Sequence, residues 1–231
     1  MSIYITGDIH GNPRRLSNKN LRLLGLEITE GDKVIVCGDF GLPWYDDVED
    51  EYWLNWLEEK PFEILFVDGN HENFDLLYQF PVEERYGGKV HRVRSNVYHL
   101  MRGEIYEIEG KTFFAFGGAT SVDRHCRIEF VSWWSQENFS RDEFENAVEN
   151  LEKVDFTVDY VLTHTAPKRF IVNSTDITSY IDNCPTVQML SGLEKMLIYK
   201  KWFFGHFHVD YCVKESVAAW MYNGIRRVDC I

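Results

Sequence analysis

The chain has 231 residues, enough to bury one substantial core, so the sequence predicts a single domain over residues 1–231. Hydrophobic residues make up 45% of the chain and charged residues 26%, the composition of an ordinary globular protein. The formal net charge is −13, and an acidic surface repels a polyanion at long range, so binding of nucleic acid without regard to its sequence is disfavoured.

Short apolar runs that end abruptly in Gly, Asp or Asn recur along the first seventy residues. They lie at Ile3–Thr6, Val34–Cys37 and Ile64–Val67. Runs of this length rich in Val, Ile and Phe are typical of buried strands. We therefore expect three strands whose carboxyl ends carry polar residues.

Helical patterns lie between these runs. Apolar residues recur at helical spacing from Asp47 to Glu59, and Pro61 follows the end of that pattern. Asn12 and Pro13 are typical of a helix N-cap and first helical position. The apolar face of this earlier helix is expected to consist of Leu16, Leu23 and Leu24. Alternation of strands and helices predicts right-handed crossovers and a largely parallel sheet, in which ligands bind at the carboxyl ends of strands.

The rest of the chain continues with strands and one long loop. Lys89–Arg94 alternates basic and apolar residues, as a half-exposed strand does, and two runs around Glu109-Gly110-Lys111 predict a β-hairpin. Residues 117–138 are irregular but contain Trp133-Trp134, so we expect an ordered loop. Ser140 and Glu143 form a capping-box pattern for a helix that reaches about Lys153. The remaining predicted strands are Ile105–Ile108, Thr112–Phe116, Tyr160–Leu162 and Trp202–Phe204.

Eight polar residues follow the predicted strands, and we expect them at one edge of the sheet. Two pairs are two residues apart, so on an extended backbone both side chains of a pair point the same way. A single Asp or His at a strand end is more often a cap or a satisfied surface residue, but recurrence after nearly every strand favours one functional site. Seven of the eight form the nitrogen and oxygen ligand set that two transition-metal ions need, and no Cys is among them. The eight are Asp8, His10, Asp39, Asn70, His71, His164, His206 and His208.

In this pattern the sequence resembles the calcineurin-like metallophosphoesterases. The resemblance rests on five blocks in family order that span almost the whole chain: Gly7-Asp8-Ile9-His10-Gly11, Gly38-Asp39, Gly69-Asn70-His71-Glu72, His164 and Gly205-His206-Phe207-His208. It implies a four-layered α/β sandwich with two central mixed β-sheets flanked by helices.

The resemblance also implies a role for each position. Asp8, His10 and His208 would bind one metal ion, Asn70, His164 and His206 would bind the other, and Asp39 would bridge both. His71 would be the general acid that protonates the leaving group. The two ions would hold the attacking and leaving oxygens of an in-line displacement by a bridging hydroxide. Mn, Fe, Zn and Ni all suit such ligands, so the sequence does not name the metal.

The second block departs from the protein Ser/Thr phosphatase branch, whose pattern is G-D-x-V-D-R-G. Leu42 replaces the Asp that would orient the acid, and Pro43 replaces an Arg that would bind phosphate. Protein phosphatase activity is therefore disfavoured. Three other carboxylates could orient His71: Asp46, Asp47 and Asp75.

Phosphate-binding side chains must then come from elsewhere. The candidates lie in the loop after residue 117, and Arg suits bidentate contact with phosphate. They are Arg124, His125 and Arg127. The equally weighted alternative is that these three are solvent-facing side chains of the loop. Arg14 and Arg15 follow the first block closely but are as well explained by a solvent-facing helix.

The sequence therefore predicts a metal-dependent phosphoesterase whose partner is a small phosphorylated molecule, such as a nucleotide. Mono- and diesters both remain open. A nuclease and a catalytically inactive scaffold are the alternatives; the acidic charge opposes the first and retention of all eight residues opposes the second. Five Cys without C-x-x-C spacing, and the lack of any membrane-length apolar run or basic leader, predict a cytoplasmic protein.

Overall fold

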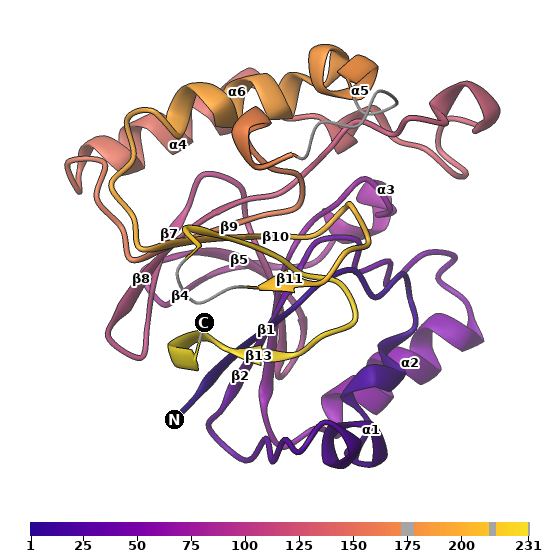
Figure 1. Cartoon of the computed structure of the whole chain (residues 1–231). Coiled ribbons are helices and arrows are strands. Elements are labelled where there is room, and N and C mark those ends of the chain that lie inside the picture. Colours follow the sequence, from indigo (N-terminus) through magenta and orange to yellow (C-terminus); the bar gives the residue numbers. More distant parts are fainter. Residues whose placement is uncertain (172–177, 213–215, 231) are drawn as a thin grey trace.

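The computed structural model describes residues 1–171, 178–212 and 216–230. Its described residues form two mixed β-sheets packed face to face, with helices on the outer face of each sheet (Figure 1). Helices α1 and α2 cover one side, and α4, α5 and α6 cover the other. The predicted four-layered sandwich is confirmed.

The first sheet has the strand order β13-β1-β2-β3-β6-β5-β4. Strands β1, β2 and β3 are parallel, with Ile3 opposite Lys33 and Lys33 opposite Glu63. Strand β6 is parallel to β3, whereas β5, β4 and β13 pair antiparallel to their neighbours. The strands are β1 (Ile3–Thr6), β2 (Lys33–Cys37), β3 (Glu63–Val67), β4 (Val82–Arg85), β5 (Gly88–Arg94), β6 (Val97–Leu100) and β13 (Arg226–Arg227).

The second sheet has the order β11-β12-β10-β9-β8-β7. Strands β8, β9, β10 and β12 are parallel, and the hairpin of β7 and β8 forms as predicted. The strands are β7 (Ile105–Ile108), β8 (Lys111–Phe116), β9 (Tyr160–Thr163), β10 (Lys201–Phe204), β11 (Tyr211–Cys212) and β12 (Ala218–Trp220).

The helices begin at recognisable caps. Asp47 accepts hydrogen bonds from two backbone amides at the start of α2, and Ser140 and Glu143 form the predicted capping box of α4. The α-helices are α1 (Asn18–Leu23), α2 (Val48–Glu58), α3 (Phe74–Leu77), α4 (Arg141–Glu152), α5 (Thr178–Asn183) and α6 (Pro185–Leu193). Short 3-10 helices lie at Pro13–Leu16, Arg124–Cys126, Ser135–Glu137, Lys168–Phe170 and Val228–Cys230.

The expected helix after Asn12 is broken. Asn12 and Pro13 begin only a 3-10 turn, and Ser17 then caps a separate helix, α1, by accepting from the amide of Asn20. This restart rotates the apolar face, so the prediction that Leu23 and Leu24 are buried was wrong. They are 76% and 47% exposed, whereas Leu16 and Leu21 are buried.

Three apolar clusters fill the three interfaces between the layers. Val34 and Val36 of β2 face α1 and α2, whereas the intervening Ile35 faces the second sheet, as the two-residue period of a strand requires. Strand β10 alternates likewise, with Phe203 between the sheets and Trp202 against α4 and α6. Burial of each such side chain contributes about 1.5–3 kcal/mol. Sheets that bury both faces leave the strand ends as the place for polar chemistry.

Candidate metal centre

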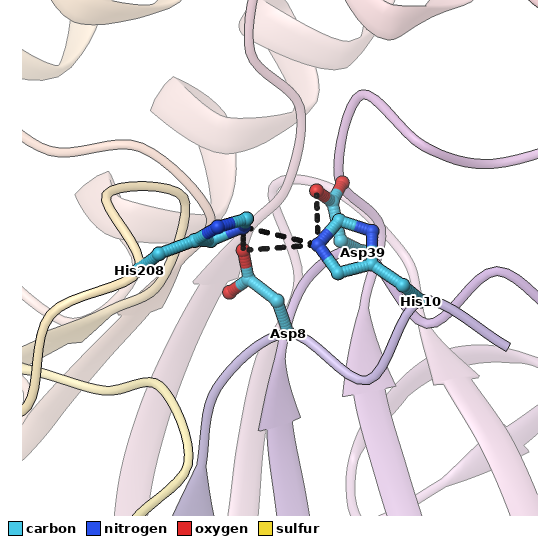
Figure 2. Close-up of side chains that lie close together, drawn as sticks. All are labelled: Asp8, His10, Asp39 and His208. Carbon is cyan, nitrogen blue, oxygen red and sulfur yellow. Dashed lines mark hydrogen bonds and ion pairs between the residues drawn. The ribbon is translucent and has the colours of Figure 1, made fainter. Parts of the chain in front are cut away.

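One group of predicted ligands surrounds the end of β1 (Figure 2). Asp8, His10, Asp39 and His208 each offer an atom, and these atoms lie within 4.8 Å of one another. The Nε2 atoms of His10 and His208 are 3.0 Å apart. Asp8 Oδ2 lies 3.2 Å from His208 Nε2 and 3.9 Å from His10 Nε2. Each of these side chains is aimed at a common point in Figure 2.

A second group converges on His164 Nε2, beyond the ends of β3 and β9. Asn70 Oδ1 and Asp39 Oδ1 each lie 3.1 Å from this nitrogen, and His206 Nδ1 lies 3.2 Å from it. The opposite ring nitrogen, Nδ1, donates to the carbonyl of Cys37 over 3.0 Å. With a metal ion bound, that bond would leave Nε2 as the coordinating nitrogen of a neutral ring.

Asp39 lies between the two groups and gives one carboxylate oxygen to each. Its Oδ1 faces His164, and its Oδ2 lies 3.7 Å from His10 Nε2. The same Oδ1 accepts the backbone amide of His71 at 2.8 Å. The side chain is almost fully buried, at 2% exposure. The structure therefore brings all seven predicted ligands into two adjacent groups that share Asp39.

The backbone at these positions differs from the extended conformation that the sequence predicted. The pairs at residues 8 and 10 and at 206 and 208 were expected on extended backbone, but both pairs lie in loops beyond the strands. His10, Asp39, His206 and His208 have φ angles of 45°, 46°, 68° and 52°, in the left-handed region. This conformation costs a non-glycine residue about 1–3 kcal/mol and clusters at functional sites. Convergence of the side chains therefore comes from tight loops, not from strand geometry.

Glycines of the motif blocks allow these loops to approach the carboxylates. A Cβ on Gly69 would lie 2.1 Å from Asp39 Oδ1, and a Cβ on Gly205 would lie 2.1 Å from Asp8 Oδ1. Neither position tolerates a side chain without displacing a carboxylate. Glycine is therefore required in the G-N and G-H blocks by the close approach of a carboxylate as well as by the turn.

The electrostatics of the two groups favour a cation. Burial opposes a charge on His164, but Asp39 outweighs burial and raises the pKa of His164 to about 10. His164 in turn lowers the pKa of Asp39, also against the effect of burial. Burial and the neighbouring His164 lower the pKa of His206 to about 3. The centre therefore stabilises positive charge beside Asp39 and keeps another ring neutral as a lone-pair donor.

The donor set fits a divalent metal ion at each group. Around His164 Nε2 the oxygens of Asn70 and Asp39 both face one nitrogen, and a single proton cannot serve both acceptors. Such crowding of acceptors is relieved by a cation. Carboxylate, amide and imidazole ligands without thiolate suit Mn, Fe, Ni or Zn.

The predicted acid, His71, lies beside the first group, with its ring centroid 4.9 Å from that of His10. Of the three proposed phosphate-binding residues, Arg127 reaches this ring. Its Nη1 lies 3.3 Å from His71 Nδ1, and its Nη2 lies 3.2 Å from His71 Nε2. Arg127 is itself held by both carboxylate oxygens of Asp123. Arg124 and His125 are exposed in the same loop.

Two of the three carboxylates that could orient His71 are engaged elsewhere. Asp75 accepts from Trp134 Nε1 at 2.8 Å, and Asp47 caps α2. Asp46 lies in the turn before α2, where its backbone amide donates to Asp50. The side chain that contacts the ring nitrogens of His71 is instead Arg127.

Two residues with structural roles at the centre were missed by sequence reasoning. Glu72 is buried and accepts backbone amides from Phe40, Gly41 and Gly69, so it joins the loops after β2 and β3. Its place as the last residue of the G-N-H-E block was the available signal. Arg15 is not solvent-facing: it donates to the carbonyls of Gly7 and Asp8 and fixes the loop after β1.

The chain is thus a two-sheet α/β sandwich that gathers nitrogen and oxygen side chains at its strand ends. A family model described as calcineurin-like phosphoesterase matches residues 1–210. The chain belongs to the calcineurin-like phosphoesterase family. In the described residues, no helix has the length and apolar character needed to cross a membrane.

Two solved structures are similar to this chain. One is a proposed 5′-nucleotidase from Staphylococcus aureus in complex with alpha-ketoglutarate, with 15% identity, a TM-score of 0.49, and coverage of 98% of this chain and 50% of that one. The other is the sulfate thiohydrolase SoxB from Thermus thermophilus in complex with glycerol, with 12% identity, a TM-score of 0.44, and coverage of 96% and 51%. The chain thus spans about half the length of these structures. No curated protein matches the chain.

Proposed function

We propose that the chain is a dinuclear metal-dependent phosphoesterase that hydrolyses a phosphate mono- or diester of a small molecule. The observation that carries this proposal is the division of Asp39 between the two groups, one oxygen to His164 and the other to His10. Asp8, His10 and His208 would hold one ion, and Asn70, His164 and His206 the other. The family match supports the phosphoester class, and the acidic net charge of −13 still disfavours a nucleic acid.

Two such ions, when bound, would supply Lewis acidity at the ester and would lower the pKa of a water molecule. The protein orients this chemistry through buried contacts. Glu72 fixes the loop that carries Asp39 by accepting the amide of Phe40, which follows Asp39, and that of Gly69 in the loop after β3. Asp39 is further fixed by the amide of His71. A carboxylate held in this way needs no reorganisation when charge develops in the transition state.

His71 would donate the proton that the leaving oxygen needs. Burial lowers the pKa of His71, and the nearby Asp39 acts in the opposite direction. Arg127 would bind a non-bridging phosphate oxygen. It would also orient the ring of His71 relative to that phosphate, because its guanidinium reaches both ring nitrogens. General acid catalysis of this kind contributes about 10²–10⁴-fold.

The test is turnover of a generic aryl phosphate monoester and the matching diester by protein stripped of metal and then restored with Mn²⁺. We expect metal-dependent turnover that is lost in Asp39→Asn and reduced about 10²–10⁴-fold in His71→Ala. Glu152→Gln, an exposed carboxylate at the end of α4, is the matched control and should keep full activity. A folded protein that turns over neither ester with any divalent metal would overturn the proposal and favour an inactive scaffold.

The preferred ester would also decide between mono- and diesterase activity, which the geometry leaves open. Strictly cytoplasmic location and a single domain over residues 1–231 stay predictions of the sequence.

A further inference from the structure

A cavity of about 350 Å³ opens directly beside the predicted acid. His10 and His71 line it next to the first ligand group, and the other lining residues come from Gly11, from the loop between β2 and α2 and from the first turns of α2. This volume lies at the lower end of the range for small-molecule sites, about 300–1,000 Å³. The contiguity with His71 places the cavity where the leaving group of an ester must lie if His71 protonates it.

Aromatic side chains dominate the outer part of this cavity. Trp44, Tyr45 and Trp53 line it together with Leu42. The Trp44 ring packs edge-on against the buried Trp134, with centroids 5.4 Å apart and planes at 88°. Arg14 lies over the Trp53 ring at 4.9 Å, so one face of that ring is already covered. Tyr45 is 73% exposed, so Trp44, half-buried and held against Trp134, is the fixed ring that an occupant can contact.

The loop that carries these rings is fixed before any ligand binds. One oxygen of the buried Asp50 accepts the backbone amides of Trp44, Tyr45 and Asp46, at 2.8, 2.5 and 2.7 Å. Asn73 donates to the carbonyl of Trp44 at 2.7 Å and ties the loop to the start of α3. A preorganised aromatic surface binds a planar group with little loss of conformational entropy.

The charge of the cavity limits what it accepts. Its described lining includes the carboxylates of Asp47, Glu49 and Asp50 and no Lys or Arg. These three carboxylates outnumber the one guanidinium, that of Arg14, which lies over the lining ring of Trp53, so an anionic group placed there would meet net repulsion. The phosphate itself would lie at the ligand groups. The phosphate site, which bound metal ions would make cationic, is therefore distinct from this acidic, aromatic cavity for the leaving group.

We propose that this cavity selects esters whose leaving group is a planar, uncharged aromatic alcohol and rejects those that carry a second anionic group. The inference rests on the proposed phosphoesterase function and names the substrate class of the same site. Stacking on Trp44 would contribute about 0.5–1.5 kcal/mol beyond apolar burial. The corresponding preference over a saturated ring of the same size is about 2–10-fold in kcat/KM.

The test compares four monoesters: methyl, benzyl, cyclohexylmethyl and para-carboxybenzyl phosphate. The last three derive from alcohols of similar reactivity, so differences in kcat/KM report the cavity. We expect benzyl to exceed cyclohexylmethyl about 2–10-fold and para-carboxybenzyl to be the poorest of the three. Methyl phosphate does not reach the cavity and provides the baseline.

Variants then assign the preference to named residues. Trp44→Leu should lower kcat/KM for the benzyl ester to that for the cyclohexylmethyl ester, whereas Trp44→Phe should retain the preference. Glu49→Gln, at an exposed position, should raise kcat/KM for the para-carboxybenzyl ester about 2–3-fold. Tyr211→Leu, an exposed ring in β11, is the control and should change none of the four.

Two failures are distinguishable. Turnover of methyl phosphate with no benzyl preference, or a preference that survives in a folded Trp44→Leu, would overturn the inference alone. Absence of turnover for all four esters in the metal-loaded wild type would overturn the proposed function and this inference with it.

Discussion

The guanidinium of Arg127 lies against the imidazole of His71, with an Nη atom 3.2–3.3 Å from each ring nitrogen. The lone-pair directions of an imidazole diverge, so both contacts cannot be in-line hydrogen bonds at once. One planar guanidinium nevertheless reaches both ring nitrogens, which the single ammonium group of Lys cannot reproduce. Asp123 Oδ1 and Oδ2 bind the other edge of the guanidinium at 2.7 and 3.0 Å.

Arg127→Met should lower kcat/KM for the best ester about 10–100-fold, because one charge-assisted contact contributes about 1.5–3 kcal/mol. The kcat/KM of Arg127→Lys should lie between those of wild type and Arg127→Met, since Lys keeps the charge without the planar contact. Steady-state kinetics on metal-loaded protein measures this. Arg141→Met, which removes an 87% exposed guanidinium on α4, is the control. Full activity in Arg127→Met would show that Arg127 has only a packing role.

Gly69→Ala should disrupt the centre although it removes no ligand. Its new Cβ would lie 2.1 Å from Asp39 Oδ1 and 2.3 Å from the Asp39 backbone nitrogen. Because backbone cannot move as a flexible side chain does, we expect loss of at least one bound metal ion and a fall in activity of about 10²-fold or more, as a 1 Å misplacement causes. Metal content per chain and kcat measure these effects.

The matched control is Gly192→Ala in α6, where nothing lies within 4 Å of the new Cβ. It should leave activity unchanged and stabilise the helix by about 0.5–1 kcal/mol. Equal activity of the two alanine variants would contradict the packing explanation for Gly69.

Much of the fold followed from local sequence because the central strands are buried on both faces. Strands such as β2 and β10 are continuous apolar runs, and polar residues after them mark the strand ends. The ordered loop was also predicted correctly, since Trp134 is buried. In contrast, β11 and β13 have two residues each, too few to show a strand pattern, and β13 forms by pairing with β1, more than 200 positions away in the chain. Their existence depends on tertiary structure.

The candidate site was predictable in its residues but less so in its geometry. Left-handed backbone at His10 and His208 brings these rings together, and no local pattern distinguishes that conformation from an extended one. Arg127 lies 56 positions from His71, so their contact depends on the path of the loop after β8. Burial of Glu72 likewise arises from the packing of two loops.

Metal binding should stabilise the fold, and Asp39 should matter more than any single histidine. A ligand at 100 times its Kd stabilises the native state by about 2.7 kcal/mol per site. We expect excess Mn²⁺ to raise the free energy of unfolding of wild type by about twice that amount, and chelation to reverse it. His208→Ala should lose about half of this gain, whereas Asp39→Asn should lose most of it, because Asp39 contacts both groups.

Chemical denaturation with and without Mn²⁺ measures this linkage, and isothermal titration gives the stoichiometry. Glu152→Gln should show the full wild-type gain. Loss of the same fraction in Asp39→Asn and His208→Ala would contradict the shared position of Asp39.

The buried pair of Asp68 and Arg102 should make the fold sensitive to acid. Arg102 donates to Asp68 Oδ2 through Nε at 2.9 Å and Nη2 at 2.5 Å, and His99 Nε2 lies 3.1 Å from Oδ1. Burial alone would raise the pKa of Asp68, but Arg102 and His99 outweigh it and lower that pKa. A carboxyl whose pKa is lower in the folded state stabilises the fold fully above its unfolded pKa of about 3.9.

That stabilisation is lost as pH falls from about 4 through the lowered pKa, because the unfolded chain then binds a proton that the folded chain does not. Arg102→Met should cost about 3–5 kcal/mol at pH 7, since it leaves Asp68 buried without its partner. The double variant Asp68→Asn with Arg102→Met should be more stable than Arg102→Met alone and should lose the part of the acid dependence that Asp68 supplies. Urea denaturation at pH 7 and at pH 3 tests both expectations, and an Arg102→Met protein as stable as wild type would show that the pair contributes nothing to the fold.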